Sequence, residues 1–452
     1  MNNNLIQKLS ILKISIFKDF KKYSFLSISR FLFYAFVFLL PFQIKVIAYT
    51  SPLYFSGNFN PFTSFFIHLT DIVFFMAVIC WGISYIKNEY KEKISYGNHT
   101  MFILLFVFLL IAEISVFFAE DRLLAFNLFI RFIEFTLVYF FAVNKVVKLK
   151  TIINVFIASV SFQAFIAVFQ YIKQGAVGLH FLGEPYISPV NYGIAKINVS
   201  DTTLIRPYGT FAHPNILAGY LLTAMILTFH RIRSKEYICY PLLLLQTAAF
   251  VLAFSRGAFL ALLVACLVYV SVKETRISLK YILLVLSIFI FFAVLFNFEQ
   301  TLISRLLFTD IESFNERVFY FNISKWMFYK NPLGTGLGNF TLMMPDFVSL
   351  KLDPWIYQPV HNIYMLLLNE TGIQGVVTFL LIFLMFPVFV FKSMKKSLSS
   401  KKDLGSTLLS IIVAIFVIGL FDHYLISLYQ GLALLFLVFA LCGRYINFSE
   451  NR

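Results

Sequence analysis

The sequence predicts an all-α protein that crosses a membrane many times. Of its 452 residues, 60% are hydrophobic and only 13% are charged, whereas about a quarter of the residues of soluble domains are charged. The apolar residues gather in about twelve runs, and one membrane span requires roughly 20 such residues. A chain of this composition cannot bury its apolar surface in water, so we interpret the runs as membrane helices.

These runs alternate with polar loops along the whole chain. Their approximate ranges are 28–48, 63–86, 101–119, 124–143, 151–172, 211–229, 237–254, 257–272, 279–298, 363–391, 406–421 and 427–443. The seventh and eighth runs are short and meet at the sequence "SRG", which is consistent with a tight hairpin.

The basic residues predict the orientation of the spans. With the N-terminus inside the cell, every loop on the cytoplasmic side is rich in Lys and Arg, as the positive-inside rule requires. These loops are 87–93, 145–150, 231–235, 273–280 and 392–402. The net charge of +15 is therefore a topology signal, and we expect no nucleic-acid partner.

The expected organisation has five parts. They are a basic cytoplasmic segment 1–27, nine spans over 28–298 with an outer loop at 173–210, a long periplasmic loop 299–360, three spans over 361–445, and a cytoplasmic tail 446–452. Segment 1–27 does not resemble a signal peptide, because a compact apolar core and a cleavage site are missing. The four cysteines fall in or beside apolar runs, so we expect no disulfides.

The long loop contains a predicted helix. Ser313 is followed three residues later by Glu316, which is the pattern of a capping box, and Asn331-Pro332 marks the expected helix end. The sequence "GTGLGNF" follows, and its backbone N–H groups are weak candidates for binding phosphate. Long ordered loops of membrane proteins tend to carry function.

Three arginines on the outer side are not explained by the orientation signal. Arg206 precedes a span, Arg256 lies between two apolar runs, and Arg317 lies on the predicted loop helix. Arg206 and Arg317, each taken alone, are explained equally well by contacts with lipid headgroups. A charge as close to hydrocarbon as Arg256 is a candidate functional residue by default. Because guanidinium groups bind phosphate oxygens in pairs, the three together favour a diphosphate ligand.

His361 lies where the long loop returns to the membrane, in "VHNIYMLLLNETG". A lone histidine is more often structural, but a neutral imidazole beside the arginines can accept a proton from a hydroxyl group. No outer carboxylate outside the long loop is an evident competitor for the base. Because no cluster of carboxylates is present on that side, we expect neither a metal ion nor a cofactor. This combination favours glycosyl transfer from a lipid diphosphate.

Two ion pairs are expected inside the spans. Arg131 and Glu134 lie three residues apart on one helix, and His68 and Asp71 have the same spacing. We interpret both pairs as structural.

Four segments resemble the O-antigen ligase and polymerase superfamily in their order, together with the number of spans and the long outer loop before the last spans. They are "RPYGTFAHPNILAGYL", "SRGAFLALLVA", "ERVFYFNISKWMFYKNPLGTGLGNF" and "VHNIYMLLLNETGIQG", within about residues 200–385. The resemblance implies a multi-pass enzyme of the bacterial inner (plasma) membrane, with its active site on the periplasmic face. It implies an inverting, metal-independent glycosyltransferase that uses an undecaprenyl-diphosphate-linked glycan and works among membrane lipids.

The same resemblance implies roles for individual residues. The catalytic residues would be His361, Arg317 and Arg256, and Arg206 would join the two arginines in binding the diphosphate. The supporting groups would be Asn362, Glu370 and Asn215.

The acceptor stays open between two related activities. A ligase passes finished polysaccharide to lipid A-core, whereas a polymerase adds repeat units to a growing glycan. A transporter is less consistent with the sequence, because paired mid-membrane carboxylates and two related halves are not evident.

Overall fold

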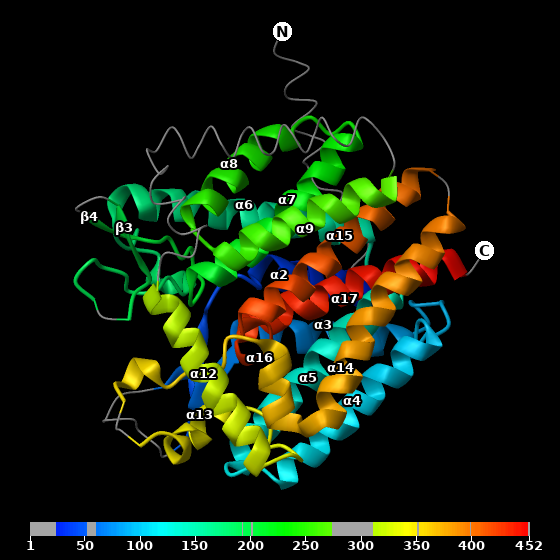
Figure 1. Ribbon diagram of the computed structural model, residues 1–452. Coiled ribbons are helices and arrows are strands. Elements are labelled where there is room, and N and C mark those ends of the chain that lie inside the picture. Colours follow the sequence, from blue (N-terminus) through cyan, green and yellow to red (C-terminus); the bar gives the residue numbers. More distant parts are fainter. Residues whose placement is uncertain are drawn as a thin grey trace.

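The structure is a computed structural model that describes residues 24–51, 60–191, 193–199, 202–273, 311–349, 352–397 and 399–450 (Figure 1). These parts are mostly helical. The long helices are α2 (Phe25–Leu39), α3 (Leu69–Ile86), α4 (His99–Phe117), α5 (Arg122–Val143), α6 (Leu149–Lys173), α7 (Pro214–Arg233), α8 (Cys239–Leu252), α9 (Arg256–Lys273), α12 (Ile311–Lys330), α14 (Ile363–Lys395), α15 (Ser399–Phe421) and α17 (Tyr429–Glu450). Short helices α13 (Phe340–Met343) and α16 (Tyr424–Ser427) lie between them, together with the single turns η2 (Pro61–Thr63), η3 (His180–Leu182), η4 (Met344–Phe347) and η5 (Pro354–Ile356).

The helices coincide with the apolar runs of the sequence. Each run within the described residues contains one long helix, while the run 279–298 lies outside them. Within the described part of the chain, eight helices are long and apolar enough to cross a membrane, and α2, α8 and α9 are shorter apolar helices. The chain is therefore a multi-pass membrane protein.

The mostly helical structure is consistent with the all-α prediction, and it also contains two short antiparallel hairpins. Strand β1 (Lys45–Thr50) pairs with β2 (Ser64–His68), and β3 (Lys196–Val199) pairs with β4 (Thr202–Ile205). The first two runs are thus partly strand. Helix α2 stops just before Pro41, which cannot supply the backbone N–H that a continuing helix needs.

Helix α12 differs from its prediction at one end. Ser313 already lies within the described helix, so the prediction of Ser313 as the capping residue is wrong. It ends at Lys330, immediately before Asn331-Pro332, as expected. The helix packs along the first part of α14, where the Asn369 side chain donates a hydrogen bond to Ser324 Oγ over 2.6 Å.

Helix α14 breaks at Gly372, whose φ of 71° and ψ of −174° are not helical. The loop after α12 packs into this break. The backbone N–H of Thr335 donates to Asn369 O over 2.8 Å, and that of Gly336 donates to Glu370 O over 3.0 Å. These two amides of the glycine-rich segment therefore hold the break and do not face a phosphate.

An ion cluster joins α3 to α5 in the membrane. Arg131 Nη1 lies 2.7 Å from Asp71 Oδ1 and 2.6 Å from Glu134 Oε2, which confirms the expected Arg131–Glu134 pair. The other expected pair is wrong in its atoms, because Asp71 Oδ2 accepts a hydrogen bond from the backbone N–H of His68 and not from its ring. All four residues are buried, and the charges of Arg131, Asp71 and Glu134 compensate one another.

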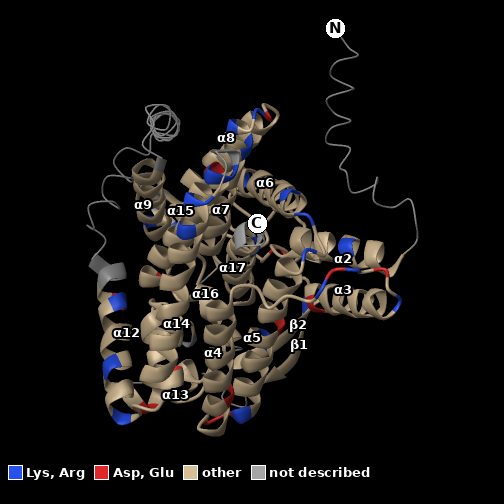
Figure 2. Cartoon of the chain, turned by 90° about the vertical axis from the view of Figure 1, so that its right-hand side faces the viewer, with Lys and Arg blue, Asp and Glu red and all other residues tan. Residues whose placement is uncertain are grey.

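Many Lys and Arg residues lie at the end of the molecule near α8 and the neighbouring parts of α6, α7 and α15, and others lie along α12 (Figure 2). Helix α12 and the short α13 lie away from that end in the same view. The candidate site lies among the helix ends beside α12.

Candidate functional site

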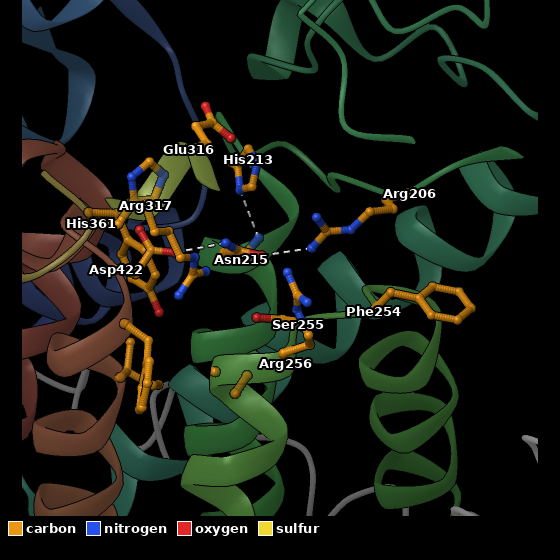
Figure 3. A pocket seen from close by; sticks show the side chains of 15 residues that line it. Arg206, His213, Asn215, Phe254, Ser255, Arg256, Glu316, Arg317, His361 and Asp422 are labelled. Carbon is orange, nitrogen blue, oxygen red and sulfur yellow. Dashed lines mark hydrogen bonds between the residues drawn. The ribbon is translucent and has the colours of Figure 1, made fainter. Parts of the chain in front are cut away.

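A cavity of about 220 Å³ collects the residues that the sequence singles out (Figure 3). Arg206, Arg256, Arg317 and His361 all line it, although they come from four separate segments. Figure 3 shows the three guanidinium groups directed into one space, with His361 at its edge.

Four local structures hold these side chains. Arg206 follows strand β4, and Arg256 is the first residue of α9. Arg317 lies in the first half of α12, and His361 precedes α14 by two residues. The arrangement thus depends on helix ends and on the loop helix, which the sequence places close to the membrane surface.

Asn215 connects one arginine to a carboxylate. Its Oδ1 accepts a hydrogen bond from Arg206 Nη2 over 2.7 Å, and its Nδ2 donates to Asp422 Oδ2 over 2.7 Å. Arg206 Nε also donates to Ala253 O over 2.8 Å, at the end of α8. These bonds fix the guanidinium of Arg206 against the cavity wall.

Two helix N-termini add positive potential to the cavity. Helix α9 begins with Arg256, and α7 begins beside Asn215, where His213 Nδ1 accepts the N–H of Asn215 over 3.1 Å. The amide groups of a first helical turn have no partners within the helix, and the helix dipole is positive there. This end of a helix therefore favours an anion, especially a phosphate group.

Asp422 is the residue of this site that our sequence analysis missed. It lies directly after α15, is buried, and lines the cavity with Arg317 and His361. The expectation that only loop carboxylates compete with His361 is therefore wrong. Its signal in the sequence is weak, because a lone Asp in the loop "DHYL" resembles any acidic residue at the end of a span.

The electrostatic environment keeps the histidines neutral. Burial lowers the pKa of His213 and of His423 to about 3. Burial also lowers the pKa of His361, assisted by Arg317, while the Asp422 carboxylate opposes this shift. Burial of Asp422 favours its neutral form, but nearby imidazoles and the hydrogen bond from Asn215 hold the pKa of its carboxyl below the usual range. With neutral imidazoles, the carboxylate still accepts hydrogen bonds from Asn215 Nδ2 over 2.7 Å and from the backbone N–H of His423 over 2.8 Å.

The aromatic rings of Tyr320 and His423 pack near His361, and its Nδ1 atom has no hydrogen-bond partner within the described residues. Its ring centre lies 5.4 Å from that of Tyr320 and 5.1 Å from that of His423. Its Nδ1 is buried and accepts or donates no hydrogen bond within the described part of the chain. A neutral imidazole held by packing, next to a carboxylate, has the chemistry of a general base.

The two other expected supporting groups, Asn362 and Glu370, do not line the arginine cavity. Asn362 caps α14, since its Oδ1 accepts the N–H groups of Tyr364 and Met365. Glu370 is buried, and its Oε1 accepts the N–H of Phe340 over 3.4 Å.

Comparison with known families finds one match within the chain. The family model for O-antigen ligase matches residues 241–380. This segment of the chain is similar to the O-antigen ligase family. It includes Arg256, Arg317 and His361, whereas Arg206 and Asp422 lie on either side of it. No curated protein matches the chain. The O-antigen ligase domain supports an enzyme that handles a lipid-linked glycan and an acceptor, as a ligase or a polymerase.

Proposed function

We propose that this protein transfers a glycan from undecaprenyl diphosphate to a hydroxyl group of lipid A-core, at the periplasmic face of the bacterial inner membrane. The observation that carries the proposal is the convergence of Arg206, Arg256 and Arg317 beside His361 in one cavity. The lipid tail stays in the membrane while the diphosphate enters this cavity.

The arginines stabilise the leaving group. When the bond between C1 of the sugar and the phosphate oxygen breaks, the electron pair leaves with the diphosphate. Guanidinium groups and the N-termini of α7 and α9 neutralise that charge at positions fixed before the reaction. Of the three arginines, Arg256 combines both effects, because its own charge lies at a helix N-terminus.

His361 activates the acceptor. As the acceptor oxygen bonds to C1 from the face opposite the diphosphate, its proton passes to the neutral imidazole of His361. Asp422 stabilises the imidazolium that forms, since its carboxylate raises the pKa of His361 against the effect of burial. The anomeric configuration is inverted because a single displacement occurs.

Reconstitution tests the proposal directly. Purified protein in lipid vesicles receives an undecaprenyl-diphosphate polysaccharide and lipid A-core, and the products are separated by gel electrophoresis. We expect polysaccharide joined to the core, and we expect none with Arg317→Ala. Elongation of the lipid-linked glycan without transfer to the core would assign the protein to the polymerases. Absence of both products would refute glycosyl transfer.

A further inference from the structure

A second, larger cavity adjoins the arginine cavity. Its volume is about 660 Å³, within the roughly 300–1,000 Å³ that is typical of ligand pockets. The two cavities share five lining residues, which are His213, Asn215, His361, Asp422 and Tyr424. The proposed base and its carboxylate therefore lie in the wall between two chambers, and only the smaller one is lined by Arg206, Arg256 and Arg317.

We infer that the larger cavity binds the sugar of the acceptor, an inference that rests on the proposed function. An inverting displacement requires the acceptor hydroxyl to approach C1 from the side opposite the leaving group. If the diphosphate occupies the arginine cavity, that side is the larger cavity. His361 then faces both the acceptor hydroxyl and the reacting carbon.

The lining of the larger cavity suits a saccharide. It combines aromatic rings with groups that form hydrogen bonds, and it includes Phe62, Phe66, Trp355, Asn60, Gln358 and Gln430. The face of an aromatic ring is negative, so it attracts the C–H groups on the apolar face of a sugar ring. Amide side chains bind the hydroxyl groups at the ring edge.

Trp355 is the residue best placed to hold the sugar. Its side chain is 54% exposed although it lines the cavity. The two residues that follow it are held by hydrogen bonds, since Tyr320 Oη donates to Ile356 O over 2.7 Å and Asn60 Nδ2 donates to Tyr357 O over 2.8 Å. This anchored segment leads within a few residues to His361, so a sugar on Trp355 is held at a set position relative to the base.

Tryptophan fluorescence provides a test without turnover. The chain contains three tryptophans, and Trp81 and Trp326 line neither cavity. A full-length variant with Trp81→Phe and Trp326→Phe reports only on Trp355. Titration with the methyl glycosides of glucose, galactose, mannose and N-acetylglucosamine should produce a saturable spectral change with at least one of them. Absence of a change with all four sugars would overturn the inference.

Substitution of Trp355 separates its role from a structural one. Trp355→Ala should weaken the affinity for the responding sugar, measured by saturation-transfer NMR, by about tenfold, and Trp355→Phe should restore most of it. The affinity for undecaprenyl diphosphate should not change. Trp326→Ala is the matched control, because Trp326 is 65% exposed on α12 but lies outside the cavity. Equal losses in the Trp355→Ala and Trp326→Ala variants would contradict a specific site.

Competition distinguishes the acceptor sugar from the sugar of the donor. An undecaprenyl-diphosphate monosaccharide should bind together with the free glycoside; displacement of the glycoside would assign the cavity to the donor and overturn the inference. Normal glycan transfer by the Trp355→Ala variant would contradict the acceptor site and leave the proposed function intact. Binding of the sugar through Trp355 without any glycan transfer would contradict the proposed function and leave the sugar site intact.

Discussion

Substitution of Arg256 separates the effect of its positive charge on the transfer rate from the effect of its guanidinium geometry. Lysine at this position keeps the positive charge and removes the fork of donors that binds two phosphate oxygens. We expect Arg256→Lys to lose about tenfold to a hundredfold in transfer rate, the range for removing one or two charge-assisted hydrogen bonds. Transfer is measured in vesicles at matched protein amounts. Activity equal to that of the unmodified protein would exclude a paired contact by Arg256.

His361 has two separable roles. Removing a general base costs about 10²–10⁴ in rate, so His361→Ala should nearly abolish transfer while donor binding stays unchanged. His361→Gln can orient a hydroxyl group but cannot take its proton. Near-normal turnover of the Gln variant would restrict His361 to orienting the acceptor, and near-normal turnover of the Ala variant would remove it from the mechanism.

The pH dependence of the transfer rate follows from the pKa of His361. Because burial lowers the pKa of His361, the ring stays neutral below its ordinary value of 6.5. Transfer should therefore be constant from pH 7.5 down to 6.5 and decline only at more acidic pH. Asp422→Asn removes the carboxylate that raises this pKa, so its acidic decline should lie at still lower pH, with a smaller maximal rate. A decline that begins above pH 6.5 would contradict a buried base.

Sequence reasoning found the arginines and His361, but it did not find Asp422. The arginines were recognisable because each is a charge beside apolar residues on the side where the orientation rule does not expect it. Asp422 has no such contrast, and it lies about sixty residues after His361 in the chain. Only the packing of α15 against α14 brings the two together.

Length and hydropathy predicted the described long helices except α12, which was predicted from its end signals. They did not predict the two hairpins, because "SFFIH" and the residues near Lys45 continue apolar runs that also suit a helix. Pairing between β1 and β2 is a tertiary choice that local composition does not reveal.

The break in α14 depends on one glycine. Gly372 has a φ of +71°, and an added Cβ atom would lie 2.8 Å from Leu333 O. Gly372→Ala should cost about 1–3 kcal/mol of stability and reduce transfer, because the first part of α14 carries the position of His361. Gly82→Ala in α3 is the control, since no atom lies within 4 Å of its Cβ position, and we expect a gain of about 0.5–1 kcal/mol. Thermal unfolding in detergent measures the stability of both variants. Equal stabilities of the Gly372→Ala and Gly82→Ala variants would contradict a strained backbone at Gly372.

The distribution of basic residues over the whole molecule predicts its orientation in the membrane. The basic end formed near α6, α8 and α15 should face the cytoplasm, and the arginine cavity should face the periplasm. Reporter fusions at Lys396 and at Asp353 should give opposite locations. A cytoplasmic signal from both fusions would contradict the topology and the proposed site together.

The buried cluster of Arg131, Asp71 and Glu134 also constrains how the protein is made. Helices α3, α4 and α5 leave the ribosome in that order, so Asp71 reaches the bilayer before Arg131 has been synthesised. An unpaired charge within a span costs up to about 2.5–3.5 kcal/mol on the insertion scale. In nascent chains that end after α4, Asp71→Asn should improve insertion of α3, as measured by accessibility of its flanks to a labelling reagent. In chains that include α5 this advantage of Asp71→Asn should disappear, because Arg131 then pairs with Asp71 and neutralises its charge within the membrane.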